Sequence, residues 1–338
     1  MELRRERFEA VLLDPRRGFE RTRTAVEVRW DPLTGQSCRM LPEGSMPPPA
    51  AQDLDALADR TRASCPFCEE RIEHETPQFP AEVCPEGRIQ AGEALLFPNL
   101  VPYAKWSSVS VYSPARHLLR LEELTPSLIA DNLGSQVEFA RVVLAHDSTS
   151  CWVSVNANQL PPSGSSIFHP HLQGSAHPVP TTMQRLLAEL DSGQLRRYLD
   201  LERENGERFI ATTGRIAWLA SFAPSGLAEI RAVVTDAPST VDLDADAIAE
   251  LASGLSNVLR LYAELGFQSF NLALHGAAIE SPDATLVLRV VARAYFGPLQ
   301  RSDVMWSERL YAEVATDLNP EAVAERARGL FKEARARK

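Results

Sequence analysis

The chain has 338 residues, of which 44% are hydrophobic and 24% charged, and its formal net charge is −10. This length suggests two domains, and the negative charge argues against an extended nucleic-acid surface but leaves room for a local phosphate pocket. No apolar run reaches the ~20 residues of a membrane span, and the N-terminus lacks the apolar core of a signal peptide. Five cysteines in a chain of this length do not indicate a disulfide framework. We therefore expect a cytoplasmic protein with reduced thiols.

The first half of the chain is predicted to contain strands, one helix and then more strands. Residues 1–24 are charged and should be peripheral, and residues 24–41 predict a hairpin with Asp-Pro-Leu-Thr-Gly at its tip. Residues 95–114 predict two strands that are separated by prolines. A helix is expected over 125–147, with Thr125 as N-cap and Pro126 at its first position. A strand over 151–159 and a loop lead to the histidine-rich segment.

The second half repeats this order of elements without repeating its sequence. The patterns predict helices over 181–206, 244–266 and 319–338, and strands over 215–224, 228–236, 269–277 and 285–296. The repeated order indicates an N-terminal domain over 1–185 and a C-terminal domain over 186–338.

Three of the seven histidines lie within residues 169–177, in the run His-Pro-His-Leu-Gln-Gly-Ser-Ala-His. In an extended segment His169, His171 and Gln173 share one face, because strand side chains alternate with period two. That arrangement suits a metal ligand, a nucleophile or a phosphate site. His177 lies beyond Gly174 and is expected to be a loop residue.

Cys65 and Cys68 in Cys-Pro-Phe-Cys have the spacing of a metal knuckle, although redox pairs and chance produce the same spacing. A structural zinc site needs four protein ligands, often two Cys and two His. The sequence has no second close cysteine pair, so further ligands would come from His117 and the 169–171 run. Taken alone, His117 is better explained as a surface-loop histidine.

A Ser/Gly loop precedes the histidines. Glycine lets the backbone approach a ligand, and hydroxyl and backbone N–H groups can hold phosphate oxygens; a plain loop is the alternative. Asn156 and Asn158 at the end of the preceding strand suit either ribose or phosphate contacts or strand-end turns. The loop residues are Ser163, Gly164, Ser165 and Ser166.

Together these motifs resemble the galactose-1-phosphate uridylyltransferase family of the histidine-triad superfamily. The matching segments occur in the family's order over roughly residues 28–320: RWDPLTGQ, CPFC, LLFPNLVPYAKWSSVSVYSPARH, SVNANQLPPSGSSIFHPHLQ and FNLALHGA. The resemblance implies an α+β fold of tandem histidine-triad-like domains with mostly antiparallel sheets and flanking helices. Because the second domain has no His-x-His, we expect only the first to carry the chemistry and the second to be degenerate.

The resemblance assigns roles to individual residues. His171 matches the nucleophile that forms a covalent nucleotidyl-histidine, and Gln173 matches the glutamine that bonds the phosphoryl group. Ser166 matches a serine that contacts phosphate, within the loop 163–166. The implied nucleotide contacts are Asn99 and Asn158, with Phe67 and Phe97 near the base, and the implied zinc ligands are Cys65, Cys68, His117 and His169.

The chain departs from the family in the parts that hold the acceptor. After the hairpin only Arg39 remains where the family carries phosphate-clamping arginines, and Ala292 and Ala294 stand where a second metal site has its His-x-His pair, although His275 is present. The segment 302–311 lacks the family's hexose-binding residues. Galactose 1-phosphate is therefore not the expected acceptor, and Arg289 and Arg293 could supply replacement anion contacts or be solvated strand residues.

We therefore expect a zinc-containing nucleotidyltransferase that passes a nucleoside monophosphate from a nucleotide or nucleotide-sugar donor, through His171, to a phosphorylated small molecule. The alternative enzyme is a phosphorylase or hydrolase of dinucleoside polyphosphates or nucleotide sugars with the same histidine. A zinc-stabilised nucleotide-binding protein without turnover is the alternative of another class, which the intact His-Pro-His-x-Gln disfavours. We expect no nucleic-acid or membrane partner and allow for a homodimer.

Overall fold

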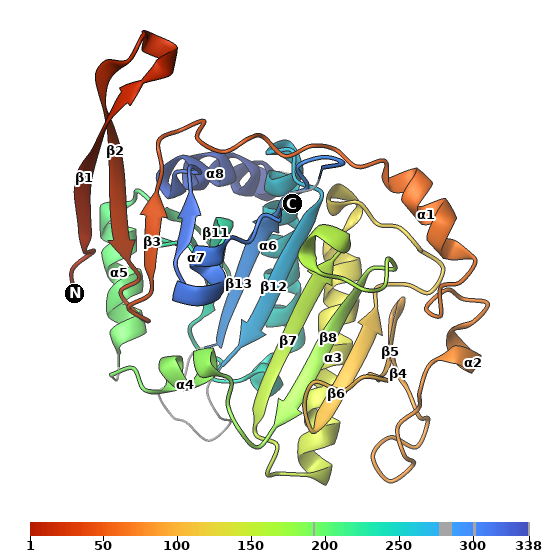
Figure 1. The fold of residues 1–338 in the computed structure, drawn as a ribbon. Helices are drawn as coiled ribbons and strands as arrows, with labels where there is room; N and C mark the ends of the chain where they lie inside the picture. Colours follow the sequence, from red (N-terminus) through yellow and green to blue (C-terminus); the bar gives the residue numbers. More distant parts are fainter. Residues whose placement is uncertain (192, 277–285, 300–301, 337–338) are drawn as a thin grey trace.

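The computed structural model describes residues 1–191, 193–276, 286–299 and 302–336. Within them the strands form a large antiparallel sheet, in the order β4-β5-β6-β8-β7-β12-β13-β11-β10-β9, and a small sheet, in the order β1-β2-β3-β14 (Figure 1). The helices are α1 (Leu54–Arg62), α2 (Ile72–Glu75), α3 (Pro126–His146), α4 (Thr182–Ala188), α5 (Gln194–Asn205), α6 (Ala245–Glu264), α7 (Trp306–Tyr311) and α8 (Pro320–Ala336).

The strands of the large sheet fall into two sets with the same internal order. The first set is β4 (Ile89–Ala91), β5 (Ala94–Pro98), β6 (Trp106–Val111), β7 (Trp152–Gln159) and β8 (His171–His177). The second set is β9 (Phe209–Thr213), β10 (Ile216–Ala220), β11 (Leu227–Val234), β12 (Ser269–His275) and β13 (Leu286–Arg293). The small sheet consists of β1 (Arg5–Asp14), β2 (Glu20–Trp30), β3 (Ser37–Met40) and β14 (Val314–Thr316).

In each set three strands precede one long helix and two strands follow it. The chain order is β4-β5-β6-α3-β7-β8 and then β9-β10-β11-α6-β12-β13. The two sets join edge to edge where β7 pairs antiparallel with β12, as in Asn158 opposite Asn271. The expected α+β fold with antiparallel sheets is confirmed. The domain limit at 185/186 falls within α4, and the two-domain division stays a prediction, because both sets share one sheet.

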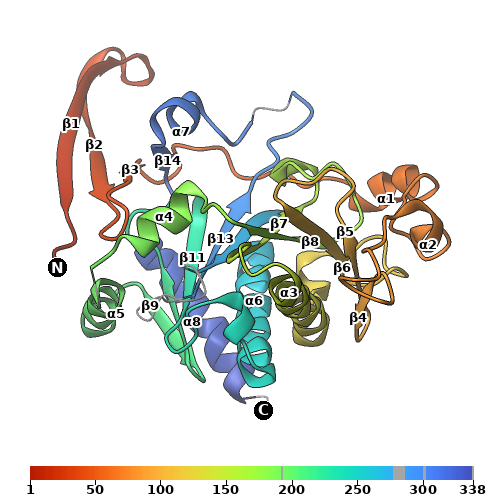
Figure 2. The same cartoon turned by 90° about the horizontal axis from the view of Figure 1, so that it is seen from below.

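Helices α3 and α6 lie side by side against one face of the large sheet (Figure 2). The main hydrophobic cluster combines residues of both helices with the inward side chains of both sets of strands, such as Leu172, Leu274 and Leu288. Period-two alternation places the neighbouring residues on the opposite face, which we call the open face. Helix α5 covers the open face over the outer strands β9, β10 and β11, with Tyr198 and Leu199 in the shared hydrophobic cluster. The central strands of the open face are therefore not covered by α5, and a binding site can form there.

Most elements match the sequence prediction, and the exceptions have local causes. Helix α3 begins after Thr125, whose hydroxyl accepts a bond from the Leu128 N–H. The helix expected over 181–206 is divided into α4 and α5, because Gly193 takes a left-handed conformation with φ 74° at the start of α5. The peripheral segment 1–24 forms most of the protruding β1–β2 hairpin (Figure 1).

Among the described helices, none is both long enough and apolar enough to cross a membrane.

Candidate active site and metal cluster

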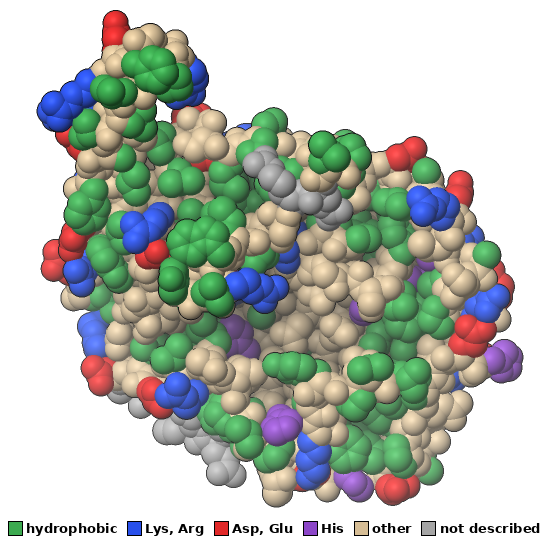
Figure 3. All heavy atoms as spheres, viewed as in Figure 1, with side chains coloured by type: hydrophobic (Ala, Val, Ile, Leu, Met, Phe, Trp, Pro, Cys, Tyr) green, Lys and Arg blue, Asp and Glu red, His purple; other side chains and the backbone are tan. Residues whose placement is uncertain are grey.

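The open face carries polar side chains on three of four neighbouring strands along one register line. Gln173 pairs with Asn156, Asn156 with Ala273, and Ala273 with Arg289, so one line crosses β8, β7, β12 and β13. His171 lies on the same face at the start of β8. The surface is hollowed over these central strands, with histidine side chains on the walls of the hollow (Figure 3). Residues from both halves of the chain therefore face one site.

Cys65, Cys68, His117 and His169 lie together beside this hollow, and all four are buried. Their candidate ligand atoms lie within 4.8 Å of one another. The Cys68 sulfur is 3.3 Å from Nδ1 of His117 and 3.7 Å from Nδ1 of His169, which is also 3.7 Å from the Cys65 sulfur. Tetrahedral zinc with ordinary Zn–S and Zn–N bonds separates its ligands by about 3.3–3.8 Å. The cluster has the donor set and the spacing that a metal ion needs.

The far nitrogen of each cluster imidazole has a fixed partner. Nε2 of His169 lies 2.9 Å from the Ser113 carbonyl, so it donates there and leaves the Nδ1 lone pair toward the sulfurs. Nε2 of His117 lies 2.9 Å from the Thr61 hydroxyl. Burial lowers the pKa of His169 to about 4, and burial beside Cys65 raises the pKa of Cys68 to about 12. The imidazole is thus in the neutral form that ligates metals, whereas the thiol needs a cation to deprotonate near neutral pH.

His171 is buried, with 6% of its surface exposed, and its ring is held in one orientation. Its Nδ1 lies 2.8 Å from the carbonyl oxygen of His169. Because a carbonyl only accepts, Nδ1 carries the proton and Nε2 keeps a lone pair. Burial lowers the pKa of this imidazole, which favours the neutral form. His169 therefore has two roles, because its side chain belongs to the Cys/His cluster and its backbone carbonyl orients the ring of His171.

Phe67 and Phe97 form an aromatic corner next to His171. Their ring centroids are 5.3 Å apart, and the Phe67 ring meets the His171 ring edge to face at 5.4 Å. Phe67 lies between Cys65 and Cys68, so a metal there would also fix this ring. Asn99 is half-buried just after β5, and its side-chain oxygen accepts a bond from the Val101 N–H. Asn99 therefore has a local turn role, two residues after Phe97 in the chain.

The three serines of the loop 163–166 have different surroundings: two bond to backbone carbonyls and one is exposed. The Ser163 hydroxyl donates to the Leu160 carbonyl at 2.7 Å, and the Ser165 hydroxyl donates to the Ile167 carbonyl at 2.6 Å. Gly164 has φ 91°, a conformation that favours glycine, and Ser166 is exposed. Of the three hydroxyls in this loop, that of Ser166 is the one best able to meet a ligand.

The structure adds a brace that sequence reasoning missed. Asn271 donates from Nδ2 to Asn158 Oδ1 at 2.6 Å and to the Ser163 carbonyl at 3.1 Å, and its Oδ1 accepts from Arg293. Arg293 is paired through two nitrogens with Asp303, each at 2.6 Å. Asn271 thus ties the loop to strands of both halves. The sequence signal for Asn271 was its period-two spacing from Ala273 and His275, which predicts that the three side chains lie on the same face of the strand.

The two candidate replacement arginines differ in what binds them. Arg293 is occupied by Asp303 and Asn271, so it is part of the brace. Arg289 donates from Nε to buried Glu229 at 2.7 Å and from one terminal nitrogen to the Ser225 hydroxyl at 2.7 Å, and its other terminal nitrogen meets only the Met183 sulfur at 3.5 Å. Of the two, Arg289 keeps donor capacity toward the hollow. Arg39 pairs with Glu313 on the small sheet.

His275 does not belong to a second metal cluster among the described residues, where the only Cys, His, Asp and Glu group close enough to hold an ion is the one at Cys65. Ala292 and Ala294 are buried in the main hydrophobic cluster.

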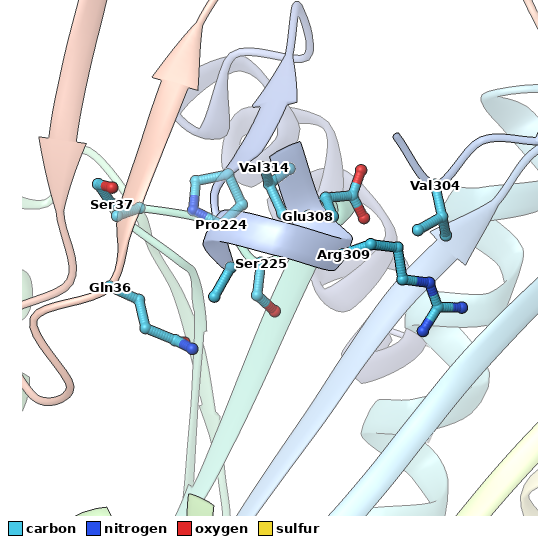
Figure 4. A pocket seen from close by; sticks show the side chains of 10 residues that line it. Gln36, Ser37, Pro224, Ser225, Val304, Glu308, Arg309 and Val314 are labelled. Atoms are coloured by element: carbon cyan, nitrogen blue, oxygen red, sulfur yellow. The ribbon is translucent and has the colours of Figure 1, made fainter. Parts of the chain in front are cut away.

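The segment 302–311 lies against the second half of the site, where Asp303 binds Arg293 and Glu308 lines a cavity together with Asn271. Helix α7 places Glu308 and Arg309 on the wall of a separate cavity of about 300 Å³, opposite Ser37 and Pro224 (Figure 4). Ser225 lines both this cavity and the central hollow.

No protein-family model matches the chain. A protein of undetermined character from Archaeoglobus fulgidus is 29% identical over 345 aligned positions, covering 98% of this chain and all of that one. The structure of an ADP-glucose phosphorylase from Arabidopsis thaliana with bound ADP-glucose superposes with a TM-score of 0.68 at 21% identity, covering 90% of this chain and 98% of the other. A uridylyltransferase structure gives 0.58 at 19% identity, with the same coverage of both chains. The resemblance expected from the sequence is confirmed at the level of the fold.

Proposed function

We propose that the protein is a nucleotidyltransferase, a divergent relative of the galactose-1-phosphate uridylyltransferases, and that His171 carries the nucleotidyl group. The observation that carries the proposal is the fixed ring of His171, with Nδ1 bonded to the His169 carbonyl and Nε2 left as a lone pair on the open face. A nucleophilic imidazole needs this tautomer and a neutral ring at neutral pH. The fold shared with a uridylyltransferase and an ADP-glucose phosphorylase supports the same chemistry.

In the first step Nε2 of His171 attacks the α-phosphorus of the donor. A P–N bond forms, the bond from the α-phosphorus to the bridging oxygen breaks, and the phosphorylated leaving group departs with that electron pair. In the second step a phosphate oxygen of the acceptor attacks the same phosphorus, and the P–N bond breaks. Nδ1 stays protonated and bonded to the His169 carbonyl in both steps. The lone pair of Nε2 forms the P–N bond, so no proton has to leave the ring.

The neighbouring groups are suited to positioning and charge stabilisation, which phosphoryl transfer chiefly requires. Gln173 lies two residues along the same face, so its amide can donate to an α-phosphate oxygen. Ser166 is exposed on its loop, so its hydroxyl and the loop backbone can do the same. Phe67 and Phe97 offer apolar ring surface to the base.

We propose that Cys65, Cys68, His117 and His169 hold zinc. The two sulfurs and two imidazoles favour zinc over magnesium or calcium, and four protein ligands leave no open position for catalysis. The ion would supply structural cross-linking. His169 then fixes the peptide whose carbonyl orients His171, which is how a structural metal would serve the nucleophile.

A second candidate function is a phosphorylase of nucleotide sugars or dinucleoside polyphosphates that uses the same histidine. The ADP-glucose phosphorylase structure favours it, because this chain superposes on that enzyme with a higher TM-score than on the uridylyltransferase, 0.68 against 0.58. In that reaction inorganic phosphate replaces the organic phosphate as acceptor, while the first step is unchanged.

The test is covalent labelling of the purified full chain with α-³²P-labelled ATP, UTP, ADP-glucose and UDP-glucose in parallel. We expect one donor to label the wild type, and we expect the label to survive base and to be released by acid, as a phosphoramidate is. His171→Ala should take no label while keeping its fold and metal content.

The matched control is His177→Ala on the same strand, since the ring of His177 only accepts the Val179 N–H at the strand end. It should label like the wild type. Label on His171→Ala, or wild-type turnover through a ternary complex without a labelled intermediate, would show that the assignment is wrong. Chasing the labelled enzyme with inorganic phosphate or with sugar phosphates separates the two candidate functions.

A further inference from the structure

The β1–β2 hairpin, which we call the arm, projects from the body of the molecule in both views (Figure 1, Figure 2). Its strands pair over the 10 residues of β1 without a register shift, from Arg5 opposite Arg29 to Asp14 opposite Glu20. β1 is the edge strand of the small sheet, so no described strand pairs with its outer side. Because an isolated two-stranded hairpin is only marginally stable in water, further strands would stabilise the arm.

One face of the arm carries no charge over three successive cross-strand pairs. They are Phe8 with Val26, Ala10 with Thr24, and Leu12 with Thr22. Phe8 leaves 52% of its surface exposed and Leu12 leaves 46%, and the hydrophobic side chains of the arm are visible in Figure 3. A row of exposed apolar side chains on one face of a hairpin is typical of an interaction surface. The opposite face mixes Val11 and Leu13 with the charged residues Arg7, Glu9, Arg21, Arg23 and Glu27.

The edge of β1 has little protection against pairing with another strand. Native edge strands are usually protected by short length, by Lys or Pro residues, or by a bulge. β1 has 10 residues, Arg-Glu-Arg-Phe-Glu-Ala-Val-Leu-Leu-Asp, without Lys or Pro, and its ladder with β2 is unbroken. Its charges alternate in sign at Arg5, Glu6, Arg7 and Glu9. The edge therefore selects for a strand with complementary charges and does not repel every strand.

A second copy of β1 provides such a strand when the two copies run antiparallel about Phe8. Each Phe8 then lies opposite the other, and Arg7 of each copy lies opposite Glu9 of the other. Cross-strand pairs of opposite charge and pairs of aromatic side chains both stabilise a sheet. Because even-numbered residues then face even-numbered residues, the uncharged face of one arm continues into that of the other.

Other registers of the two copies are less favourable. An axis at Arg7 or at Glu9 places that charged residue opposite its own counterpart, and an axis at Ala10 places Glu6 opposite Asp14. Like charges directly opposite each other in an antiparallel pair are destabilising. An axis between two residues joins the uncharged face of one arm to the charged face of the other. Charge complementarity and the uncharged face therefore both favour the axis at Phe8.

We propose that the arm binds a second copy of this chain edge to edge through β1, so that the two arms form one four-stranded sheet in the order β2-β1-β1-β2. The contact is isologous, because each copy offers the same edge. Residues 5–11 of each copy pair and form about seven backbone hydrogen bonds, within the ~10 ± 5 of a typical protein interface. No residue of the candidate active site takes part, so the proposal does not rest on the proposed function.

The first test is disulfide cross-linking of the full chain with oxidised glutathione, in a background where Cys151→Ser removes the half-buried native cysteine. Phe8→Cys should give a covalent dimer. Directly opposite Cα atoms in an antiparallel pair are about 4.5–5.5 Å apart, which is within disulfide range. Ala10→Cys is the matched control on the same face, because its counterpart lies four residues along, or about 14 Å away. It should stay monomeric, and cross-linking at Ala10 but not at Phe8 would overturn the proposal.

The second test measures association without a cross-link, by sedimentation equilibrium. The wild type should exceed the monomer mass of 37.3 kDa in a concentration-dependent way. Phe8→Arg should weaken the dimer at least about tenfold, because it places two like charges opposite each other on the uncharged face. Phe19→Arg is the matched control, since Phe19 is exposed at the tip of the arm, outside both strands.

Equal association of Phe19→Arg and the wild type, with weaker association of Phe8→Arg, supports the edge contact, and melting temperatures show that each variant is folded. A wild type that stays monomeric at its highest soluble concentration, or a dimer that Phe8→Arg leaves unchanged, would overturn the proposal. Binding of the monomer to phosphatidylserine vesicles through Phe19 would identify a lipid surface as the occupant instead.

Discussion

Strands β7 and β8 in the first half and β12 and β13 in the second hold equivalent places in the sheet, yet their open faces differ. The first pair presents His171 and Gln173 beside a complete Cys/His cluster. The second presents His275 and Arg289, with no such cluster among the described residues. Their inward faces stay alike, with Leu172 and Leu288 in one hydrophobic cluster. Packing constrains the inward positions, whereas the open positions are free to change their chemistry.

The largest effect should come from removing His171, the proposed nucleophile of the first half. His171→Gly should lower covalent labelling at least about 1,000-fold, because the P–N bond has no other imidazole to form with. Added imidazole should restore part of the turnover, since the missing group is small and diffusible. Turnover is measured with and without imidazole. If imidazole also restored activity to His275→Gly, the two halves would not differ in which histidine is the nucleophile.

Loss of one cluster ligand tests whether the first half depends on the proposed zinc ion. Cys65→Ser should abolish zinc retention and lower the melting temperature by about 10 °C or more, because the ion would cross-link three separate segments. Metal analysis and calorimetry on chelator-free protein provide the measurement. Wild-type protein without zinc would rule out the metal assignment, and a matched Cys84→Ser variant should keep its zinc.

Gln173 tests the stabilisation of charge at the phosphorus. Gln173→Ala should slow label formation by about 100-fold, the typical loss for one donor to a developing oxyanion. Rapid-quench labelling gives the rate, and the final extent of labelling should match the wild type. A loss below threefold would mean that Gln173 does not contact the phosphoryl group.

The brace is the one place where both halves act together. Asn271→Ala should slow labelling by about tenfold, since it frees Asn158 and the loop 163–166 while the nucleophile is kept. Asn271→Asp keeps the size of the side chain and serves as the comparison. Wild-type rates in Asn271→Ala would show that the halves meet without functional coupling.

The smallest effect concerns pH. Burial lowers the pKa of His171, so the reactive neutral ring persists below the ~6.5 of an ordinary histidine. The rate of label formation should stay level from pH 8 to pH 6.5 and fall only at lower pH. A half-maximal rate above pH 6.5 would contradict the burial effect.

The sequence predicted the elements that depend on local pattern. Helix α3 follows from Thr125, Pro126 and a 3.6-residue period, and β7 and β12 follow from alternation. It also predicted that Cys65, Cys68, His117 and His169 would share a site, and the structure places them together. The sequence did not locate the α4–α5 break, because a single left-handed glycine decides it.

Only the tertiary structure decided how the two halves meet. The pairing of β7 with β12 brings Asn158 opposite Asn271, although the two are 113 positions apart in the chain. The pairing of β12 with β13 places His275 and Arg289 on one cavity. Local sequence pattern fixes the face on which a strand side chain lies, through the period of two. It does not fix which strand becomes the neighbour, because this depends on the burial of inward side chains from both halves in one core.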